Sequence, residues 1–168
     1  GGRISLTVGI FAALVATSIG AVLGAVAGFY GGSTDNVLMR FTEIIIAIPS
    51  LPLLIILSSY TQASVVVIIL IIGLLSWMAT ARIVRGSVHS VKRQDFVMAA
   101  RMMGCSNATI IGRHIIPNAM GPIIVGATLG VGAAIIIESS LSFLGLGISP
   151  PTPTWGNMLQ DSQSTMAT

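Results

Sequence analysis

Few of the side chains that most often do chemistry occur in this sequence. It has one cysteine, Cys105, and two histidines, His89 and His114. One cysteine excludes an internal disulfide, and the histidines do not stand at metal-ligand spacing beside it. His114 could serve as a base or a metal ligand, but it has no cluster of partners. We interpret it as a structural residue that hydrogen bonds to nearby backbone, and we predict no catalytic residue and no metal site.

A loop for nucleotide hydrolysis is also absent from the sequence. Residues 32–35 read Gly-Ser-Thr-Asp, but a phosphate-binding loop of the Walker type needs Gly-Lys before its serine or threonine. Lys92 is the only lysine, and it follows Val91. We expect no cofactor in this chain and no ATP hydrolysis by it.

Glu138 is an acidic residue near the outer end of the last long apolar run. A carboxylate is costly in lipid, so such a residue is a default candidate for function, here for contact with a transported substrate. Ser139 and Ser140 follow it and place it close to the membrane interface. Snorkelling or a structural hydrogen bond would explain Glu138 as well.

The composition is that of a membrane protein built from helices. Of 168 residues, 54% are hydrophobic and 8% are charged, and the mean hydropathy is +0.95. Soluble domains carry roughly 25% charged residues. Strands would leave unpaired backbone groups in hydrocarbon, and the sequence does not alternate as a membrane barrel would. Helices that pack closely through small residues fit the 19 glycines.

Apolar runs long enough to cross a bilayer mark the expected spans, since roughly 20 helical residues are needed. Gly20, Gly24 and Gly28 repeat at the spacing of a helix contact face, so this face should meet another helix. Pro49 and Pro52 predict a bend near the start of the second span. The four predicted spans are residues 4–29, 44–60, 65–81 and 119–137.

The basic residues predict the orientation, because short loops rich in arginine and lysine stay in the cytoplasm. Most of them fall within residues 82–117, which we predict to be cytoplasmic. A polar loop at residues 31–43 is then cytoplasmic too, while residues 58–64, the chain start and a loop at residues 139–160 are external. Anionic lipid is an alternative partner for these charges, and nucleic acid is not expected. The basic residues of the cytoplasmic segment are Arg82, Arg85, Lys92, Arg93, Arg101 and Arg113.

The cytoplasmic segment is itself patterned as two short helices. Asp95 is predicted to cap the first, whose apolar residues recur at helical spacing, and Gly104 to end it in a left-handed turn. Ser106 is predicted to cap a second helix, which must stop near Ile116 because Pro117 follows. Small alanines would let the first helix lie deep in a groove of another protein, with Met98, Met102 and Met103 as adaptable packing.

Several motifs resemble the permease subunits of ABC importers, specifically the dipeptide, oligopeptide and nickel branch. The family's cytoplasmic signature of two alanines, a glycine and a segment ending in proline occurs as Ala99-Ala100, Gly104 and Ile116-Pro117. The form His-x-x-Pro-Asn, which marks this branch, stands at residues 114–118. Residues 3–6, 31–35, 82–85, 141–147 and 151–156 match further family patterns, so the resemblance covers essentially the whole chain. Met98 stands where the family usually has glutamate, and any salt bridge from that position is lost.

The resemblance implies an all-α, multi-pass bundle of the type I ABC-importer permease kind in a bacterial inner membrane, with residues 82–117 as a coupling loop. It implies a cytoplasmic ATPase that binds the ATP, a second, homologous permease subunit in a heterodimer, and an external solute-binding protein. It also implies a fragment without the first and last spans of a six-span subunit. The residues expected to contact the ATPase are Phe96, Ala99, Ala100, Met103, Gly104, His114, Pro117 and Asn118.

Three functional hypotheses follow. The leading one is a permease subunit for peptides or related small solutes. The second is a nickel permease of the same branch, against which stands the lack of a histidine, cysteine or acidic cluster in the spans. The third is a self-contained channel or an intramembrane enzyme, although both histidines lie in the segment predicted to be cytoplasmic.

Overall fold

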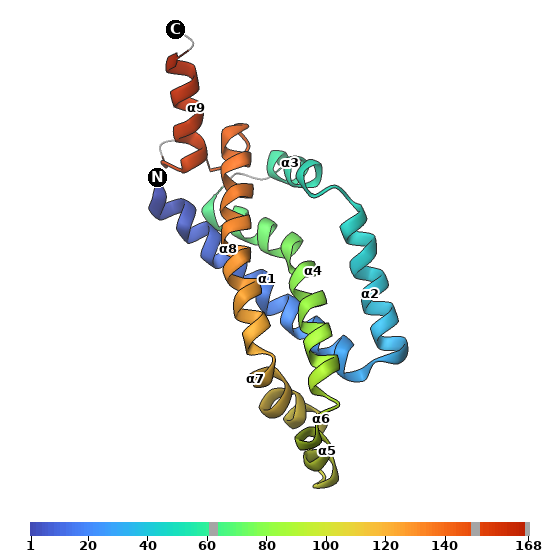
Figure 1. The fold of residues 1–168 in the computed structure, drawn as a ribbon. Coiled ribbons are helices and arrows are strands. Elements are labelled where there is room, and N and C mark those ends of the chain that lie inside the picture. Colours follow the sequence, from blue (N-terminus) through green and yellow to red (C-terminus); the bar gives the residue numbers. More distant parts are fainter. Residues whose placement is uncertain (61–63, 149–151, 167–168) are drawn as a thin grey trace. The chain divides into compact units, whose positions relative to one another are not determined.

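The structure is a computed structural model that describes residues 1–60, 64–148 and 152–166. All regular elements within these residues are helices, as predicted (Figure 1). In chain order they are α1 (Gly2–Tyr30), α2 (Gly32–Ala47), α3 (Ser50–Tyr60), α4 (Val65–Val91), α5 (Asp95–Met102), α6 (Asn107–Thr109), the π-helix η1 (Ile110–Ile115), α7 (Ile116–Asn118), α8 (Met120–Phe143) and α9 (Trp155–Met166).

Three helices in the described part of the chain, α1, α4 and α8, are long and apolar enough to cross a membrane. A fourth candidate is the pair α2 and α3, which is bent by 77°. The predicted bend is thus confirmed, because α2 ends before Pro49 and Pro52 lies in the first turn of α3. Proline is tolerated there, since the first amides of a helix have no partner within it.

The prediction of a polar loop at residues 31–43 is wrong. Gly31 and Gly32 make the turn, with φ of +66° and +53°, and α2 begins directly at Gly32. Asp35 lies in its first turn, where a carboxylate interacts favourably with the helix dipole. Polarity therefore marked the end of an apolar run and not the end of helical structure.

The predicted ends of the third and fourth spans, at residues 81 and 137, fail for the same reason. Helix α4 continues past residue 81 to Val91, so the first part of the expected coupling loop is an extension of a span. Residues 139–143 belong to α8 and residues 155–160 to α9, so only residues 144–148 and 152–154 of the predicted external loop are described outside helices. Pro150 and Pro151, which contributed to that prediction, lie outside the described residues.

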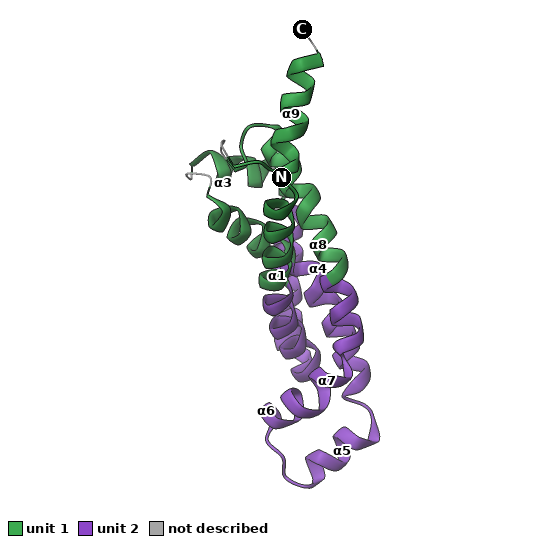
Figure 2. Cartoon of the chain, turned by 90° about the vertical axis from the view of Figure 1, so that its left-hand side faces the viewer, with its two compact units in different colours: residues 1–16, 48–76, 128–168 green, residues 17–47, 77–127 purple. Residues whose placement is uncertain are grey.

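The chain forms two compact units, shown in green and purple in Figure 2. Unit 1 comprises Gly1–Ala16, Ile48–Ser76 and Thr128–Thr168, and unit 2 comprises Thr17–Ala47 and Trp77–Ala127. Each has its own apolar core. The core of unit 1 contains Val8, Ala12, Leu54, Ile68, Ile72, Ala134, Leu141 and Ile148. That of unit 2 contains Ala25, Phe29, Val84, Val88, Val91, Val97, Ala100, Ile110, Ile115, Ala119 and Ile123.

Within unit 2, the glycine face of α1 packs directly on the backbone of α4, as the sequence predicted. A Cβ at Gly20 would lie 2.6 Å from the carbonyl oxygen of Trp77, and one at Gly28 would lie 2.7 Å from that of Arg85. Gly24 meets the carbonyl of Ala81 in the same way. No side chain fits between the two helices at these positions, which is why they carry glycine.

This contact predicts opposite effects for one substitution at two glycines. Gly24→Ala should destabilise the protein by about 1–3 kcal/mol, because the added methyl group would clash with the α4 backbone, which cannot move away as a flexible side chain could. At Gly86, in α4, a Cβ would have no atom within 4 Å, so Gly86→Ala should be neutral or stabilising by up to about 1 kcal/mol. Unfolding of both variants in detergent measures the difference, and equal stability of the two would contradict the packing described.

Candidate functional site

Both ends of α5 are closed by backbone contacts. Its N-cap is Gln94, whose carbonyl accepts from the Val97 amide at 3.0 Å, and Asp95 is the first helical residue and not the predicted cap. At the other end, Gly104 has the expected left-handed φ of +76°. The Cys105 amide donates to the Ala100 carbonyl at 3.2 Å and the Gly104 amide to the Arg101 carbonyl at 3.1 Å. This paired closure satisfies the last carbonyls and stops the helix sharply.

One side of α5 is buried and the other is open. Val97 and Ala100 are each only 1% exposed and belong to the core of unit 2. Ala99 is exposed, and Met103 is 76% exposed. The two alanines of the predicted docking face therefore differ: Ala99 is on the surface, whereas Ala100 is packed against the protein's own interior.

The second short helix differs from the prediction. Ser106 does cap it, since its Oγ accepts from the Thr109 amide at 3.3 Å. The chain does not leave the helical conformation at Ile116, which has φ −57° and ψ −47°. It passes through η1 and α7, and Pro117 falls in the first turn of α7, where its missing amide costs little. The wider π-helical turn of η1 is an irregularity of the kind often found at functional sites.

Three predicted contact residues lie close together along this segment. The ring of His114 lies 6.4 Å from that of Phe96, centroid to centroid, in a tilted arrangement. Asn118 Nδ2 donates to the carbonyl oxygen of His114 at 2.7 Å. Hence the ring of His114 lies beside α5 and its carbonyl oxygen accepts from the last residue of α7, while Phe96 is partly exposed beside it.

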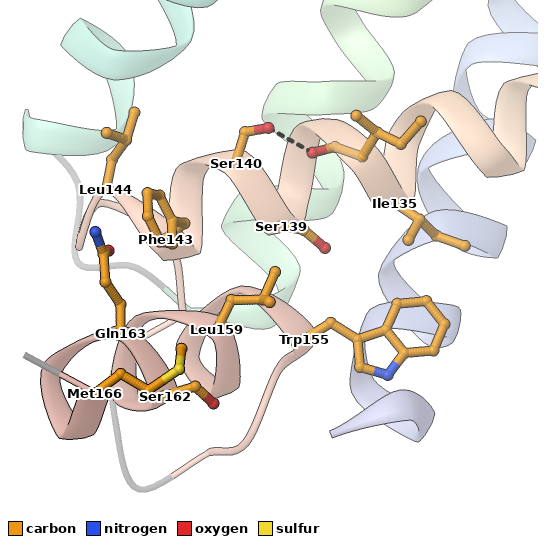
Figure 3. Close-up of a pocket in the computed structure, with 11 residues that line it drawn as sticks. Ile135, Ser139, Ser140, Phe143, Leu144, Trp155, Leu159, Ser162, Gln163 and Met166 are labelled. Atoms are coloured by element: carbon orange, nitrogen blue, oxygen red, sulfur yellow. Dashed lines mark hydrogen bonds between the residues drawn. The ribbon is translucent and has the colours of Figure 1, made fainter.

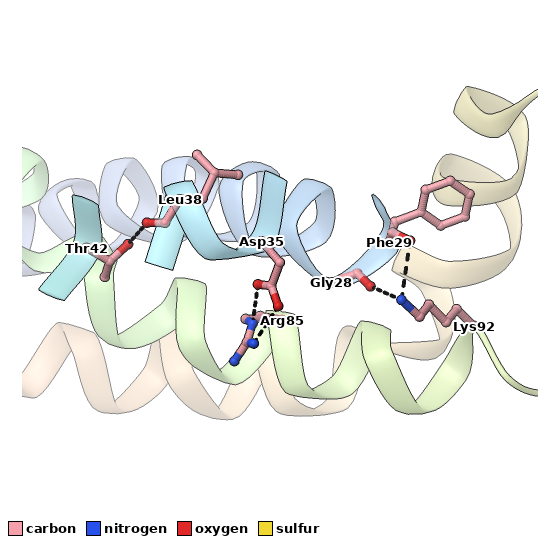
Figure 4. A network of polar contacts seen from close by, with 7 residues as sticks. All are labelled: Gly28, Phe29, Asp35, Leu38, Thr42, Arg85 and Lys92. Carbon is pink, nitrogen blue, oxygen red and sulfur yellow. Dashed lines mark hydrogen bonds and ion pairs between the residues drawn. The ribbon is translucent and has the colours of Figure 1, made fainter. Parts of the chain in front are cut away.

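We define residues 94–118 as the coupling segment. This segment and Lys92, which lies just before it, both contact the end of α1. The guanidinium of Arg101 lies 5.6 Å from the ring centroid of Phe29, a cation–π geometry. Lys92 Nζ donates to the carbonyl oxygens of Gly28 at 2.7 Å and of Phe29 at 3.4 Å (Figure 4). A cation on the last carbonyls of a helix satisfies acceptors that have no helical partner.

Helix α2 is held on α4 by one charged and one aromatic contact. Arg85 forms a two-pronged ion pair with Asp35, in which Nη2 donates to Oδ2 at 2.5 Å and Nε donates to Oδ1 (Figure 4). Phe41 stacks on Trp77, with centroids 6.4 Å apart and ring planes at 20°. Planar, bidentate pairing gives the contact a defined geometry as well as energy.

In unit 1, Glu138 is fully buried and hydrogen bonded. Its Oε1 accepts from Ser142 Oγ at 2.7 Å, and its Oε2 accepts from Ser5 Oγ at 3.0 Å. Ser5 in turn accepts from the Trp155 amide at 3.2 Å. One carboxyl group therefore joins α1, α8 and the first residue of α9, which is the structural hydrogen bond considered for it from the sequence.

A groove lies between α8 and α9 in unit 1, close to this network (Figure 3). Thr154 caps α9, since its Oγ1 accepts from the Asn157 amide at 3.2 Å. Glu138 is not part of the groove wall. The wall is mostly apolar and is formed by Ile135, Ile136, Ser139, Ser140, Phe143, Leu144, Trp155, Leu159, Ser162, Gln163 and Met166.

Residues 20–168 match the family of binding-protein-dependent transport system inner membrane components. The chain belongs to this family. The several apolar helices of the structure agree with this membership. The chain is therefore a multi-pass component of a bacterial inner membrane.

Relatives within this family carry the names of peptide permeases. The chain is 43% identical to the oligopeptide transport system permease protein OppC of Haemophilus influenzae, over 99% of this chain and 53% of the relative. It is 43% identical to the dipeptide transport system permease protein DppC of Bacillus subtilis, over 99% and 52%. It is 39% identical to the glutathione transport system permease protein GsiD of Pectobacterium atrosepticum, over 99% and 55%. The chain thus spans about half the length of the curated relatives it matches.

Sequence reasoning about this family member missed the groups that hold the helices of unit 2 together. It noted Asp35 and Arg85 only as separate motif residues, although charges at the ends of apolar helices are usually paired. It took Lys92 as a marker of topology and did not foresee its contact with α1. Val97 also escaped notice, because the search followed the predicted contact face and not the opposite, buried side.

The Glu138 network predicts a loss of stability when the carboxyl group is removed. Glu138→Leu should destabilise the protein by about 1–3 kcal/mol, because the Ser5 and Ser142 hydroxyls lose their buried acceptor. Ser140→Ala is the control, since Ser140 bonds only to the Ile136 carbonyl of its own helix among the contacts described. Thermal unfolding in detergent compares them. Unchanged stability with reduced transport would instead support direct substrate contact by Glu138.

Proposed function

We propose that this chain is the core of a permease subunit in an ATP-driven importer of peptides or related small solutes. In this proposal, a separate cytoplasmic ATPase grips the coupling segment, and a second, homologous permease completes the pathway. An external solute-binding protein delivers the solute. The proposal rests on family membership together with one observation: α5 is buried on one side and open on the other.

The open side of α5 suits docking into a groove. Ala99 has almost no side chain, so another protein's backbone can approach the helix closely there. Met98, Met102 and Met103 are exposed, Met102 to 90%, and their flexible thioether side chains adapt to the shape of a partner. Phe96 adds a partly exposed aromatic ring next to His114.

The buried side of α5 suits the transmission of force. Val97 and Ala100 share one core with residues of α1, α4, η1 and the start of α8. Because packed interiors deform little, a displacement of α5 moves these helix ends as one body. Closure of the ATPase subunits would then tilt spanning helices and alternate the opening of the pathway.

Peptide-like solutes are the proposed cargo. The relatives described above are named for oligopeptides, dipeptides and glutathione. Among the described residues, no group of three or more histidine, cysteine or acidic side chains could hold a metal ion, which gives no support to nickel. The family is one of transport components, and this favours transport over the rival of an intramembrane enzyme.

The test is a bulky charge on the open side of α5 in the intact permease. Ala99→Glu should lower co-purification of the ATPase and peptide uptake by about tenfold or more, because a carboxylate is forced into a close, desolvated contact. Membrane insertion and thermal unfolding should not change. Quantitative pull-down and uptake of labelled dipeptide measure the two effects.

Two control variants separate docking from folding. Ala100→Glu places the same charge in the core and should reduce folded protein, whether or not an ATPase is present. Ser164→Glu, at an exposed position of α9, should change neither docking nor stability. Normal uptake by Ala99→Glu, or solute flux through purified permease without any ATPase, would contradict the proposal and favour a self-contained channel.

A further inference from the structure

A polar pocket of about 400 Å³ lies in unit 2 between α2 and α4. We propose that it binds the phosphate of an anionic phospholipid headgroup. The pocket contains no residue of the coupling segment, so the inference does not depend on the proposed function. Its walls are formed by Asn36, Met39, Arg40, Glu43, Arg82 and Arg85.

The pocket carries a positive charge that the protein does not neutralise. Arg85 is committed to Asp35 by its two-pronged ion pair. Arg40 lies 3.2 Å from Glu43, but this pair is 83% and 51% exposed, and exposed pairs of this kind contribute little. Arg82 is exposed, and its side chain has no hydrogen bond or ion pair with any described residue. Three arginines thus face two carboxylates, and one cation is left for a ligand.

The chemistry of these groups favours phosphate. A guanidinium presents parallel N–H donors that match two phosphate oxygens, and Arg40 can turn from Glu43 to do the same. Asn36 lines the same pocket and adds an amide donor. A bound phosphate would therefore find several donors and one uncompensated positive charge.

The position of the pocket along the helices matches the level of lipid headgroups. Arg40 and Glu43 directly precede the apolar residues at the end of α2, and Arg82 is the first charged residue after the apolar part of α4. Both helices thus change from apolar to charged at the pocket, as at a membrane surface. Basic pockets between helices at this level are suited to anionic headgroups.

Exposed apolar side chains distinguish a lipid from free phosphate as the ligand. Phe41 lies between the lining residues Arg40 and Glu43, Ile44 follows them along α2, and the two apolar residues are 54% and 65% exposed. Acyl chains of a bound lipid would cover them, whereas a soluble phosphate would leave them bare. The combination of a charged pocket and an adjoining apolar surface is the reason to assign a phospholipid.

The experiment uses the intact permease in vesicles of equal parts phosphatidylglycerol and phosphatidylcholine, with a trace of photoreactive phosphatidylglycerol. Labelling at the pocket should exceed that by photoreactive phosphatidylcholine. Arg82→Gln should reduce the phosphatidylglycerol labelling about fivefold, the effect of one basic residue near an anionic surface. Arg82→Lys should keep most of it, and Arg40→Gln should lower it in the same direction.

A matched control and a competitor decide the outcome. Arg113→Gln removes an exposed charge outside the pocket and should leave lipid labelling unchanged. Equal labelling of the wild-type protein and of Arg82→Gln would overturn the proposal. Displacement of the lipid probe by millimolar inorganic phosphate would also overturn it, in favour of a site for a soluble anion.

Discussion

The close approach of α1 and α4 at Gly20, Gly24 and Gly28 is the contact on which the arrangement of unit 2 depends. With the two backbones this near, Lys92 at the end of α4 can reach the last carbonyls of α1. The same approach brings Phe29 into one core with α5 and within reach of Arg101. A larger residue in the glycine face would separate the helices and remove all three contacts together.

Helix ends in this protein are defined by the backbone and not by polarity. Helix α8 ends in the same paired closure as α5, with the Leu146 amide on the Leu141 carbonyl at 2.9 Å and the Gly145 amide on the Ser142 carbonyl at 3.0 Å. In both helices the residue whose carbonyl accepts the longer-range bond, Ala100 or Leu141, is buried. The chain is therefore turned back toward its own core directly after each helix, which makes both stops rigid.

This explains which features could be predicted from the sequence. Local rules sufficed for the left-handed turn at Gly104, the cap at Ser106, the bend at Pro49 and the glycine face of α1, because each depends on a few neighbouring residues. The ends of α2, α4 and α8 were misplaced, because hydropathy reports the apolar stretch and a helix can continue beyond it. The pairing of Asp35 with Arg85 and the burial of Ala100 depend on tertiary packing, to which a single sequence gives little access.

Some helices of unit 2 share a packed core with α5, whereas α2 is attached through contacts with α4. This difference implies different mechanical roles for these helices. The ends of α1 and α4 and the start of α8 share a core with α5, so they must follow it closely when it moves. Helix α2 contributes no residue to that core and is attached to α4 by the Asp35–Arg85 pair and the Phe41–Trp77 stack. An ion pair and one stacked ring are easier to break and remake than a packed core. A displacement of α5 should therefore pass directly into the ends of α1 and α4 and the start of α8, and α2 is the helix of unit 2 that can respond separately.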